Sequence, residues 1–270
     1  MPEGDTVWRQ AKNLEQALQE KILSRSDVRV PAFATADLAG YAVESSTARG
    51  KHLLLTCRKP GAEDVVIHSH LKMEGSWQLY RPDEPWRRPA HTARIVLHTG
   101  DTVAVGFALG ILELLSPAQT EAALAFLGPD LLGPDWDAAE AQRRLRSDPG
   151  QAIGLALLDQ HNLAGIGNIY RNELCFLARV HPTLPVADVP DLPRLVDQAK
   201  RLLEANKGRT QRNTTGAPGR IRAWVYGRAH EPCLRCGTLI VKAELAGRVI
   251  YSCPRCQALG HQEPEKQDSQ

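Results

Sequence analysis

The feature that most constrains the fold is the spacing of four cysteines near the end of the chain. Cys233 and Cys236 form one Cys-x2-Cys pair, and Cys253 and Cys256 form a second pair after sixteen intervening residues. Two such pairs at this separation are typical of a tetrathiolate zinc site. The acidic start MPEGD does not resemble a secretory signal that would favour disulfides instead. The sequence therefore predicts a zinc-binding module at 228–258.

A second constraint lies at residues 154–176, which read GLALLDQHNLAGIGNIYRNELCF. Two helical patterns flank a turn that contains Gly165 and Gly167, and glycine permits backbone angles and close approaches that other residues do not. The turn directly precedes a helix, whose unpaired N–H groups and dipole favour an anion. Asn168 can cap that helix or donate its amide to the same anion. We predict a phosphate site here, and a plain turn between two helices is the alternative.

The size and composition of the chain indicate an ordinary globular protein. The 270 residues are enough for a sizeable core and favour two domains. The 43% of apolar and 24% of charged residues are typical of proteins that are not embedded in a membrane. The apolar runs are too short to span a bilayer. We therefore expect a cytoplasmic protein.

Charge is distributed unevenly along the chain. The net charge of +2 does not by itself indicate a nucleic-acid partner. Residues 200–228, however, contain eight basic side chains against one acid, Glu204. Such a segment suits a polyanion, although a solvated basic face explains the charge equally well. Residues 207–222 within it are rich in Gly and Thr and are predicted to form a loop that is mobile unless a partner binds it.

Hydrophobic periodicity predicts helices and strands in separate parts of the chain. Apolar residues at three- and four-residue spacing predict an amphipathic helix within residues 1–23, and further helices at 137–146 and 191–206. Between residues 41 and 107, short β-rich runs follow one another with glycine-containing turns and no helix between them. The expected fold class is therefore α+β, with an antiparallel β-sandwich in the N-terminal half.

The first residues of the chain offer a nucleophile. If the initiator methionine is removed, Pro2 begins the chain with a secondary amine, and an α-amino group titrates near pH ~8. A secondary amine that attacks an aldehyde-level carbon forms an iminium ion, which is an electron sink. Glu3 beside it can transfer protons. Many unrelated chains begin with these residues, so this pattern gains weight only from the rest of the sequence.

Three further residues are predicted to contact DNA. Arg248 lies between the two cysteine pairs, where it can reach a backbone phosphate. Lys51 follows a glycine at the entry to a strand and can make a second phosphate contact. Met73 lies in a turn between strands and can wedge into a base stack, as apolar side chains do in kinked DNA. A half-buried core methionine is the alternative for Met73.

Four motifs in order give the chain a family resemblance. They are MPEG at the start, the RGK turn at 49–51, LLDQHNLAGIGNIYRNE at 157–173 and EPCLRCG…GRVIYSCPRCQ at 231–257. Together they resemble the formamidopyrimidine-DNA glycosylase/endonuclease VIII family of bacterial base-excision repair enzymes. The resemblance implies a catalytic β-sandwich domain at 1–120, a helix–two-turn–helix DNA-binding domain at 121–227 and a zinc finger at 228–258. The polar composition of residues 259–270 predicts a disordered tail.

The resemblance also implies an activity, namely that of a bifunctional DNA glycosylase and abasic-site lyase. Pro2 matches the family's nucleophile, which displaces the damaged base and then breaks the strand by β- and δ-elimination. Glu3 matches its proton-transfer carboxylate. Lys51, Asn168 and Arg248 match the residues that bind the phosphates around the flipped nucleotide. The single zinc ion is implied to be structural, because four thiolates leave no open coordination position.

Two departures from the family pattern bear on the substrate. Formamidopyrimidine glycosylases carry Arg-Arg-Phe-Gly where this chain reads FALG at 107–110, so the arginine that reads an opposing cytosine is absent. This favours an endonuclease VIII-type enzyme that removes oxidised pyrimidines. The wedge is then expected from Met73 and its neighbours or from Leu109. Thr6 replaces a usual glutamate, and Asp5 is a candidate to substitute for it.

Other functions are compatible with parts of the sequence. One is a glycosylase for oxidised purines, and another is a catalytically silent protein that binds damaged DNA. An enzyme that uses the N-terminal amine on a small molecule does not need residues 200–258. The expected partner is duplex DNA with oxidised bases or abasic sites, or single-stranded DNA. The protein is expected to be a monomer at the nucleoid, with no membrane association.

Overall fold

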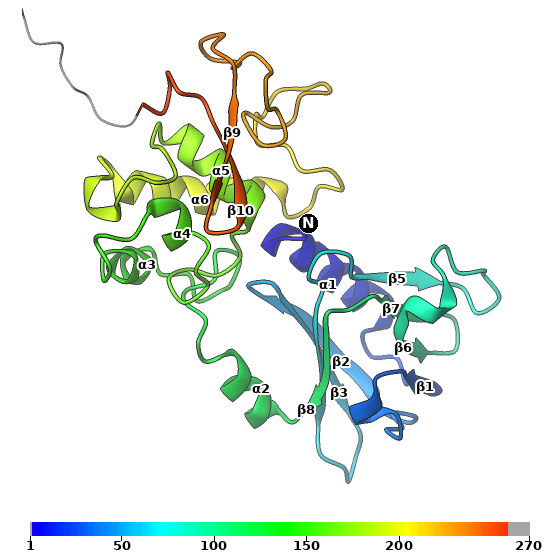
Figure 1. The fold of residues 1–270 in the computed structure, drawn as a ribbon. Coiled ribbons are helices and arrows are strands. Elements are labelled where there is room, and N and C mark those ends of the chain that lie inside the picture. Colours follow the sequence, from blue (N-terminus) through cyan, green and yellow to red (C-terminus); the bar gives the residue numbers. More distant parts are fainter. Residues whose placement is uncertain (1, 259–270) are drawn as a thin grey trace, which may run out of the picture.

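The computed structural model describes residues 2–258 and shows an α+β fold (Figure 1). Its N-terminal part contains two antiparallel four-stranded sheets with the orders β2-β3-β4-β8 and β1-β6-β7-β5. The first sheet consists of β2 (Ala42–Arg49), β3 (His52–Arg58), β4 (Val65–His70) and β8 (Ile111–Leu115). The second consists of β1 (Arg25–Val28), β6 (Ala93–His98), β7 (Val103–Phe107) and β5 (Ser76–Tyr80). The predicted β-sandwich is confirmed, although the periodicity gave no sign of β1 or β8.

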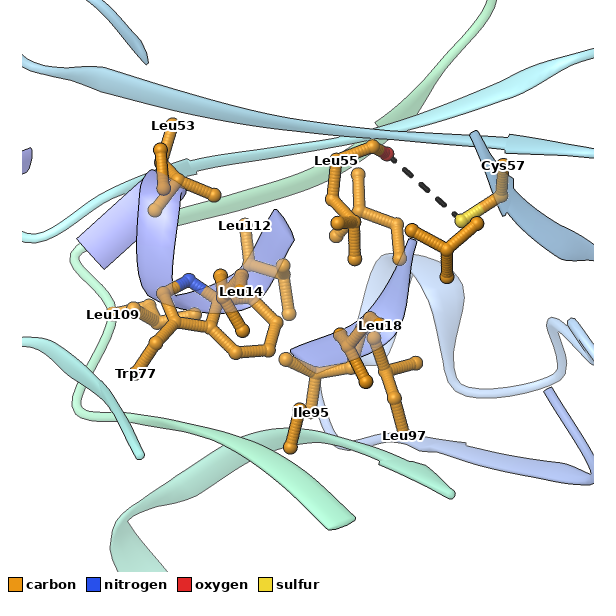
Figure 2. Close-up of a cluster of buried hydrophobic side chains, with 14 of the residues drawn as sticks. Leu14, Leu18, Leu53, Leu55, Cys57, Trp77, Ile95, Leu97, Leu109 and Leu112 are labelled. Atoms are coloured by element: carbon orange, nitrogen blue, oxygen red, sulfur yellow. Dashed lines mark hydrogen bonds between the residues drawn. The ribbon is translucent and has the colours of Figure 1, made fainter. Parts of the chain in front are cut away.

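Helix α1 (Gly4–Leu18) is part of the core of this sandwich. Its apolar stripe is fully buried, and Figure 2 shows Leu14 and Leu18 between Leu55 of β3 and Ile95 of β6. Each fully buried leucine contributes about 2 kcal/mol of transfer free energy. Because α1 is anchored in this way, the residues directly before it are held in a fixed position relative to the sandwich.

Five further α-helices follow within residues 2–258, of which α2 (Pro117–Leu124) connects the sandwich to the helical part (Figure 1). The others are α3 (Ala138–Leu145), α4 (Ile153–Ala156), α5 (Asn168–Leu177) and α6 (Leu192–Asn206). Apolar residues of α3, α4, α5 and α6 form a second core that is separate from that of the sandwich. Helices α4 and α5 with the turn between them are the predicted helix–two-turn–helix.

The C-terminal module is a small antiparallel hairpin of β9 (Val241–Leu245) and β10 (Arg248–Ser252), flanked by the cysteine pairs. The segment that precedes this module is joined to α5 through the fully buried carboxylate of Glu173. Oε1 accepts hydrogen bonds from the backbone N–H groups of Val225 and Tyr226, both at 2.9 Å, and Oε2 from that of Trp224 at 2.7 Å. The hydroxyl of Thr214 also donates to Oε2. One side chain of α5 therefore orders the segment that leads into the zinc module.

The predicted domain limits stay predictions, and helix α2 spans the predicted limit at residue 120. The predicted disordered tail at 259–270 lies outside the described residues. Within residues 2–258, no helix combines the length and the apolar character needed to cross a bilayer.

We predict that Glu173→Ala lowers the free energy of unfolding by about 3 kcal/mol, because it leaves buried N–H donors without an acceptor. Denaturant titration monitored by tryptophan fluorescence measures this change. Glu121→Ala is the matched control, since Glu121 is exposed, and it should cost less than about 0.5 kcal/mol. Equal stability of the two variants would contradict the anchoring role of Glu173.

Candidate functional site: the N-terminus and the helix–two-turn–helix

The carboxylate of Glu3 lies at the N-terminus of α5 and is fully buried. Its Oε2 accepts hydrogen bonds from the backbone N–H groups of Gly167 at 2.8 Å and Tyr170 at 3.3 Å. Its Oε1 accepts one from Ile169 at 2.7 Å. These are the unpaired donors that a helix start presents, and the helix dipole adds to the attraction. Glu3 therefore joins the start of the chain to the helical part of the molecule.

This contact corrects the prediction for the glycine-rich turn. An anion does occupy the start of α5, but it is the Glu3 carboxylate of the same chain and not a phosphate. The glycines are needed for this approach. A Cβ atom on Gly167 would lie 2.5 Å from Cδ of Glu3, and one on Gly4 would lie 3.0 Å from Cα of Gly165. The N–H of Gly4 donates to the carbonyl of Gly165 at 2.9 Å.

Asp5 is held by a residue of the basic loop. The guanidinium of Arg212 donates to both carboxylate oxygens of Asp5, at 2.8 Å and 2.5 Å. The hydroxyl of Tyr170 donates to Oδ2 at 2.9 Å, and Arg212 also lies over the ring of Tyr170. Burial by itself lowers the pKa of Arg212, but hydrogen bonding to Asp5 and nearby negative charge outweigh it and raise that pKa overall. Both oxygens of Asp5 are thus engaged, so the structure does not support Asp5 as a substitute for the missing acid/base group at Thr6.

The RGK turn brings Lys51 close to Glu3. Gly50 has φ +57°, which favours glycine, and its N–H donates to Oδ2 of the buried Asp130 at 2.7 Å. Burial lowers the pKa of Lys51 to about 8, partly offset by the negative charge of Glu3, and the positive charges of Arg248 and Lys72 lower it further. Glu3 and Arg248, both predicted site residues, therefore each act electrostatically on Lys51. Asp130, which positions the turn, was not singled out in the sequence.

Asn168 and the hairpin tip are connected directly. The side-chain N–H of Asn168 donates to the carbonyl of Val249 at 3.1 Å, next to the exposed Arg248. Arg171 donates to the side-chain oxygen of Asn168 and, at 2.9 Å, to the same carbonyl of Val249. The N-cap of α5 is Gly167, so the prediction that Asn168 caps the helix is wrong. Its side chain instead fixes the hairpin tip of the zinc module against the start of α5.

The two predicted wedge residues differ in their surroundings. Met73 is 63% exposed in the turn after β4, where Nδ1 of His70 accepts the backbone N–H of Lys72 at 2.9 Å. Leu109 is only 6% exposed and belongs to the core of the sandwich. A core position does not leave its side chain free to enter a base stack. The structure is therefore compatible with Met73 as the wedge and does not support the prediction that Leu109 contacts DNA.

The four cysteines fit one zinc ion. The Sγ atoms of Cys233, Cys236, Cys253 and Cys256 all lie within 4.8 Å of one another. Tetrahedral coordination with Zn–S distances of about 2.3 Å requires sulfur–sulfur separations of roughly 3.8 Å. Four thiolates complete the coordination sphere, so bound zinc stabilises this module and has no position for a substrate.

Three protein-family models match successive parts of the chain. The N-terminal domain model of formamidopyrimidine-DNA glycosylase matches residues 1–108, and its H2TH domain model matches residues 127–213. The model of the zinc finger found in FPG and IleRS matches residues 231–259. A probable endonuclease 8 2 from Streptomyces coelicolor is 51% identical over 265 residues, which is 96% of this chain and 94% of that protein. This chain belongs to the formamidopyrimidine-DNA glycosylase/endonuclease 8 family.

Further family members support the membership along the whole length. The DNA-(apurinic or apyrimidinic site) lyase Nei2 of Mycolicibacterium smegmatis is 49% identical, over 95% of this chain and 99% of that protein. The Lactococcus lactis Fpg, solved in complex with abasic-site DNA, superimposes with a TM-score of 0.80 at 25% identity. That match covers 95% of this chain and all of the other. The resemblance, the fold class and the structural zinc site predicted from the sequence are thus confirmed.

The lowered pKa of Lys51 predicts a pH dependence of DNA binding. Lys51 is charged below pH 8 and loses its charge above it, whereas a bound phosphate stabilises the charged form. Between the pKa of the free and the bound protein, affinity should therefore fall up to about tenfold for each pH unit. Fluorescence anisotropy with a non-cleavable abasic-site duplex between pH 6.5 and 10 measures it. This component should vanish in Lys51→Met and persist in Lys242→Met, an exposed lysine of β9. An unchanged pH profile in Lys51→Met would contradict the assignment.

Proposed function

We propose that this protein is a DNA glycosylase and abasic-site lyase whose nucleophile is the amine of Pro2. The observation that carries the proposal is the burial of Glu3 on the N-terminus of α5, because it restricts the position of Pro2, the residue directly before it, while Glu3 acts electrostatically on Lys51. A nucleophile fixed in this way gains rate from its orientation. The names and activities of the family members above support the same reaction class.

In the proposed reaction, a damaged nucleotide is flipped out of duplex DNA towards the N-terminus. The amine of Pro2 attacks C1′ of the sugar, and the base leaves. The resulting iminium ion withdraws electrons from the neighbouring bonds, so that β- and δ-elimination break the strand on both sides of the sugar. Glu3 is the predicted proton carrier. Three backbone N–H groups donate hydrogen bonds to its carboxylate. A carboxylate held in this way is also suited to positioning the amine of Pro2.

The phosphates around the flipped nucleotide are proposed to bind to Lys51, Asn168 and Arg248. These residues come from the RGK turn, the start of α5 and the hairpin tip. Arg248 is exposed, and Lys51 lies within electrostatic reach of it. The positive charges of Lys51 and Arg248 attract phosphates, whereas the neutral amide of Asn168 can only contribute a hydrogen bond. One chain supplies all of these groups, which fits the prediction of a monomer.

We propose oxidised pyrimidines as the preferred lesions. Strand β7 ends at Phe107 and β8 begins at Ile111, so the turn between them has only three residues, 108–110. Ala108 has φ +47° and Leu109 is in the core. This short turn carries no arginine that could read a base opposite the lesion, and Met73 is the proposed wedge. Chromosomal DNA as substrate implies action in the cytoplasm at the nucleoid.

Borohydride trapping on an oligonucleotide with an abasic site tests the proposed nucleophile. The protein with a free Pro2 amine should give a covalent adduct, and a version with one residue added before Pro2 should give none, because its N-terminus is a primary amine in another position. Arg248→Ala keeps the amine and should still give the adduct at saturating DNA. Adducts from both N-terminal versions would point to a lysine instead. Tight binding of abasic DNA without any adduct would favour the silent damage-binding protein.

A further inference from the structure

A row of aromatic rings crosses the seam between the sandwich and the helical part. It begins at His68 of β4 and continues through His52 of β3 to Phe126, which follows α2. It ends at His161, which lies between α4 and α5. Successive ring centroids are 5.1, 6.1 and 5.3 Å apart. We call these four residues the aromatic row, and the proposed reaction uses none of them.

A carboxylate holds the row at each end. Nδ1 of His68 lies 2.9 Å from Oε2 of Glu113, and Nε2 of His68 lies 2.8 Å from Nδ1 of His52. At the other end, Nδ1 of His161 lies 2.7 Å from Oδ1 of Asp159. Because a carboxylate only accepts hydrogen bonds, each of the two outer imidazoles turns an Nδ1–H towards its acid. The orientation of these rings is therefore set before any ligand binds.

The backbone around Phe126 and His161 is fixed as well. The N–H of Gly128 donates to the carbonyl of Gln160 at 2.8 Å, and a Cβ atom on Gly128 would lie 2.5 Å from the carbonyl oxygen of His161. Arg144 donates to that same carbonyl at 2.8 Å. The segment that carries Phe126 thus packs directly on the segment that carries His161. A preformed surface of this kind loses little conformational entropy when a ligand binds.

The row itself carries little net charge. Burial first, and then the neighbouring imidazoles and the positive charges of Lys72 and Lys51, lower the pKa of His52 to about 3, so this ring is neutral at pH 7. The carboxylates of Glu113 and Asp159 offset positive charge at the two ends. The rings therefore offer stacking surfaces to nucleobases and not charge to phosphates.

Phe126 is the accessible centre of the row. Its side chain is 41% exposed. The rings of His52 and His161 are inclined to it by 79° and 56°, so neither of them stacks face to face on it. A nucleobase is flat and aromatic, and it can occupy the ring face that these neighbours leave open.

The row lies directly beside the proposed phosphate contacts. His52 follows Lys51 in the chain, and the charge of Lys51 acts on its imidazole. The RGK turn also touches the turn before α5, since a Cβ atom on Gly50 would lie 3.0 Å from Cβ of Ala164. Cationic groups that hold a backbone, next to aromatic rings that stack on bases, are the combination by which proteins bind unpaired nucleic-acid strands.

We propose that the aromatic row binds an unpaired nucleobase of the lesion-bearing strand, which stacks on Phe126 while Lys51 holds a phosphate of the same strand. This role rests on the proposed function, because it is the phosphate contacts that bring the strand to the row. Every base has a ring face, so the site tolerates any base. The substrate class thereby includes lesions that lie next to unpaired nucleotides.

A thermodynamic cycle between Phe126→Ala and the removal of bases from the DNA tests this proposal. The probes are duplexes with a non-cleavable abasic-site analogue and an unpaired arm of the lesion strand, 5′ of the lesion in one probe and 3′ in the other. Fluorescence anisotropy measures binding. For one of the two arms, replacing its bases by abasic spacers should weaken binding to the wild type about tenfold. The same replacement should have no effect on Phe126→Ala, whereas Phe126→Trp keeps an aromatic ring and should respond as the wild type does.

Leu239→Ala is the matched control, since Leu239 is an apolar residue of the zinc module with 55% exposure, and it should leave the cycle unchanged. Additive effects of Phe126→Ala and base removal with both arms would overturn the proposal. An equal loss of affinity for fully paired duplex in Phe126→Ala would also overturn it, because Phe126 would then support the seam and not a base. The cycle breaks no bond in the DNA. A missing borohydride adduct would therefore contradict the proposed function alone, and additive effects would contradict the stacking site alone.

Discussion

The buried carboxylate of Glu3 at the N-terminus of α5 is the interaction on which the proposed site depends. Three backbone N–H groups and the helix dipole stabilise this anion away from water. The contact requires that Gly167 lacks a side chain. Because Glu3 directly precedes α1 and directly follows Pro2, this one interaction connects the sandwich, the helix–two-turn–helix and the N-terminal amine.

At several other places in the molecule, a carboxylate accepts hydrogen bonds from the backbone N–H groups or the guanidinium group of a distant segment. Asp130 accepts the N–H of Gly50, Asp5 accepts from Arg212, and Glu173 accepts three N–H groups near the zinc module. Each pair joins parts that are far apart in the sequence. These buried pairs determine the position of the loops that carry the charged groups. These loops therefore bring several positive charges near Glu3. Because the positive charges repel one another, the arrangement favours a polyanionic partner.

Much of this arrangement could be predicted from the sequence, because it follows from local patterns. The cysteine spacing predicted the zinc module, and the periodicity of residues 1–23 predicted α1. Tertiary partners leave no such pattern. The turn before α5 indicated an anion, but the sequence did not show that Glu3, 164 residues away, would supply it. For the same reason Leu109 was taken for a surface residue, and the ordering of the basic loop by Arg212 was not foreseen. Strand β1, RSDV, is four residues long and mostly polar, and β8, ILELL, is apolar at every position but one, so neither shows a clear alternation.

The central claim is that the contact between the Glu3 carboxylate and the N-terminus of α5 positions the amine of Pro2 for reaction. It is tested most directly by the rate of borohydride-trapped adduct formation in Gly167→Ala, whose Cβ would lie 2.5 Å from Cδ of Glu3. Gly208→Ala is the matched control, since a Cβ there meets nothing within 4 Å. We expect the rate at saturating abasic-site DNA to fall at least about tenfold in Gly167→Ala, with zinc content retained, and to be unchanged in the control. A folded Gly167→Ala protein that forms the adduct at the wild-type rate would contradict the claim.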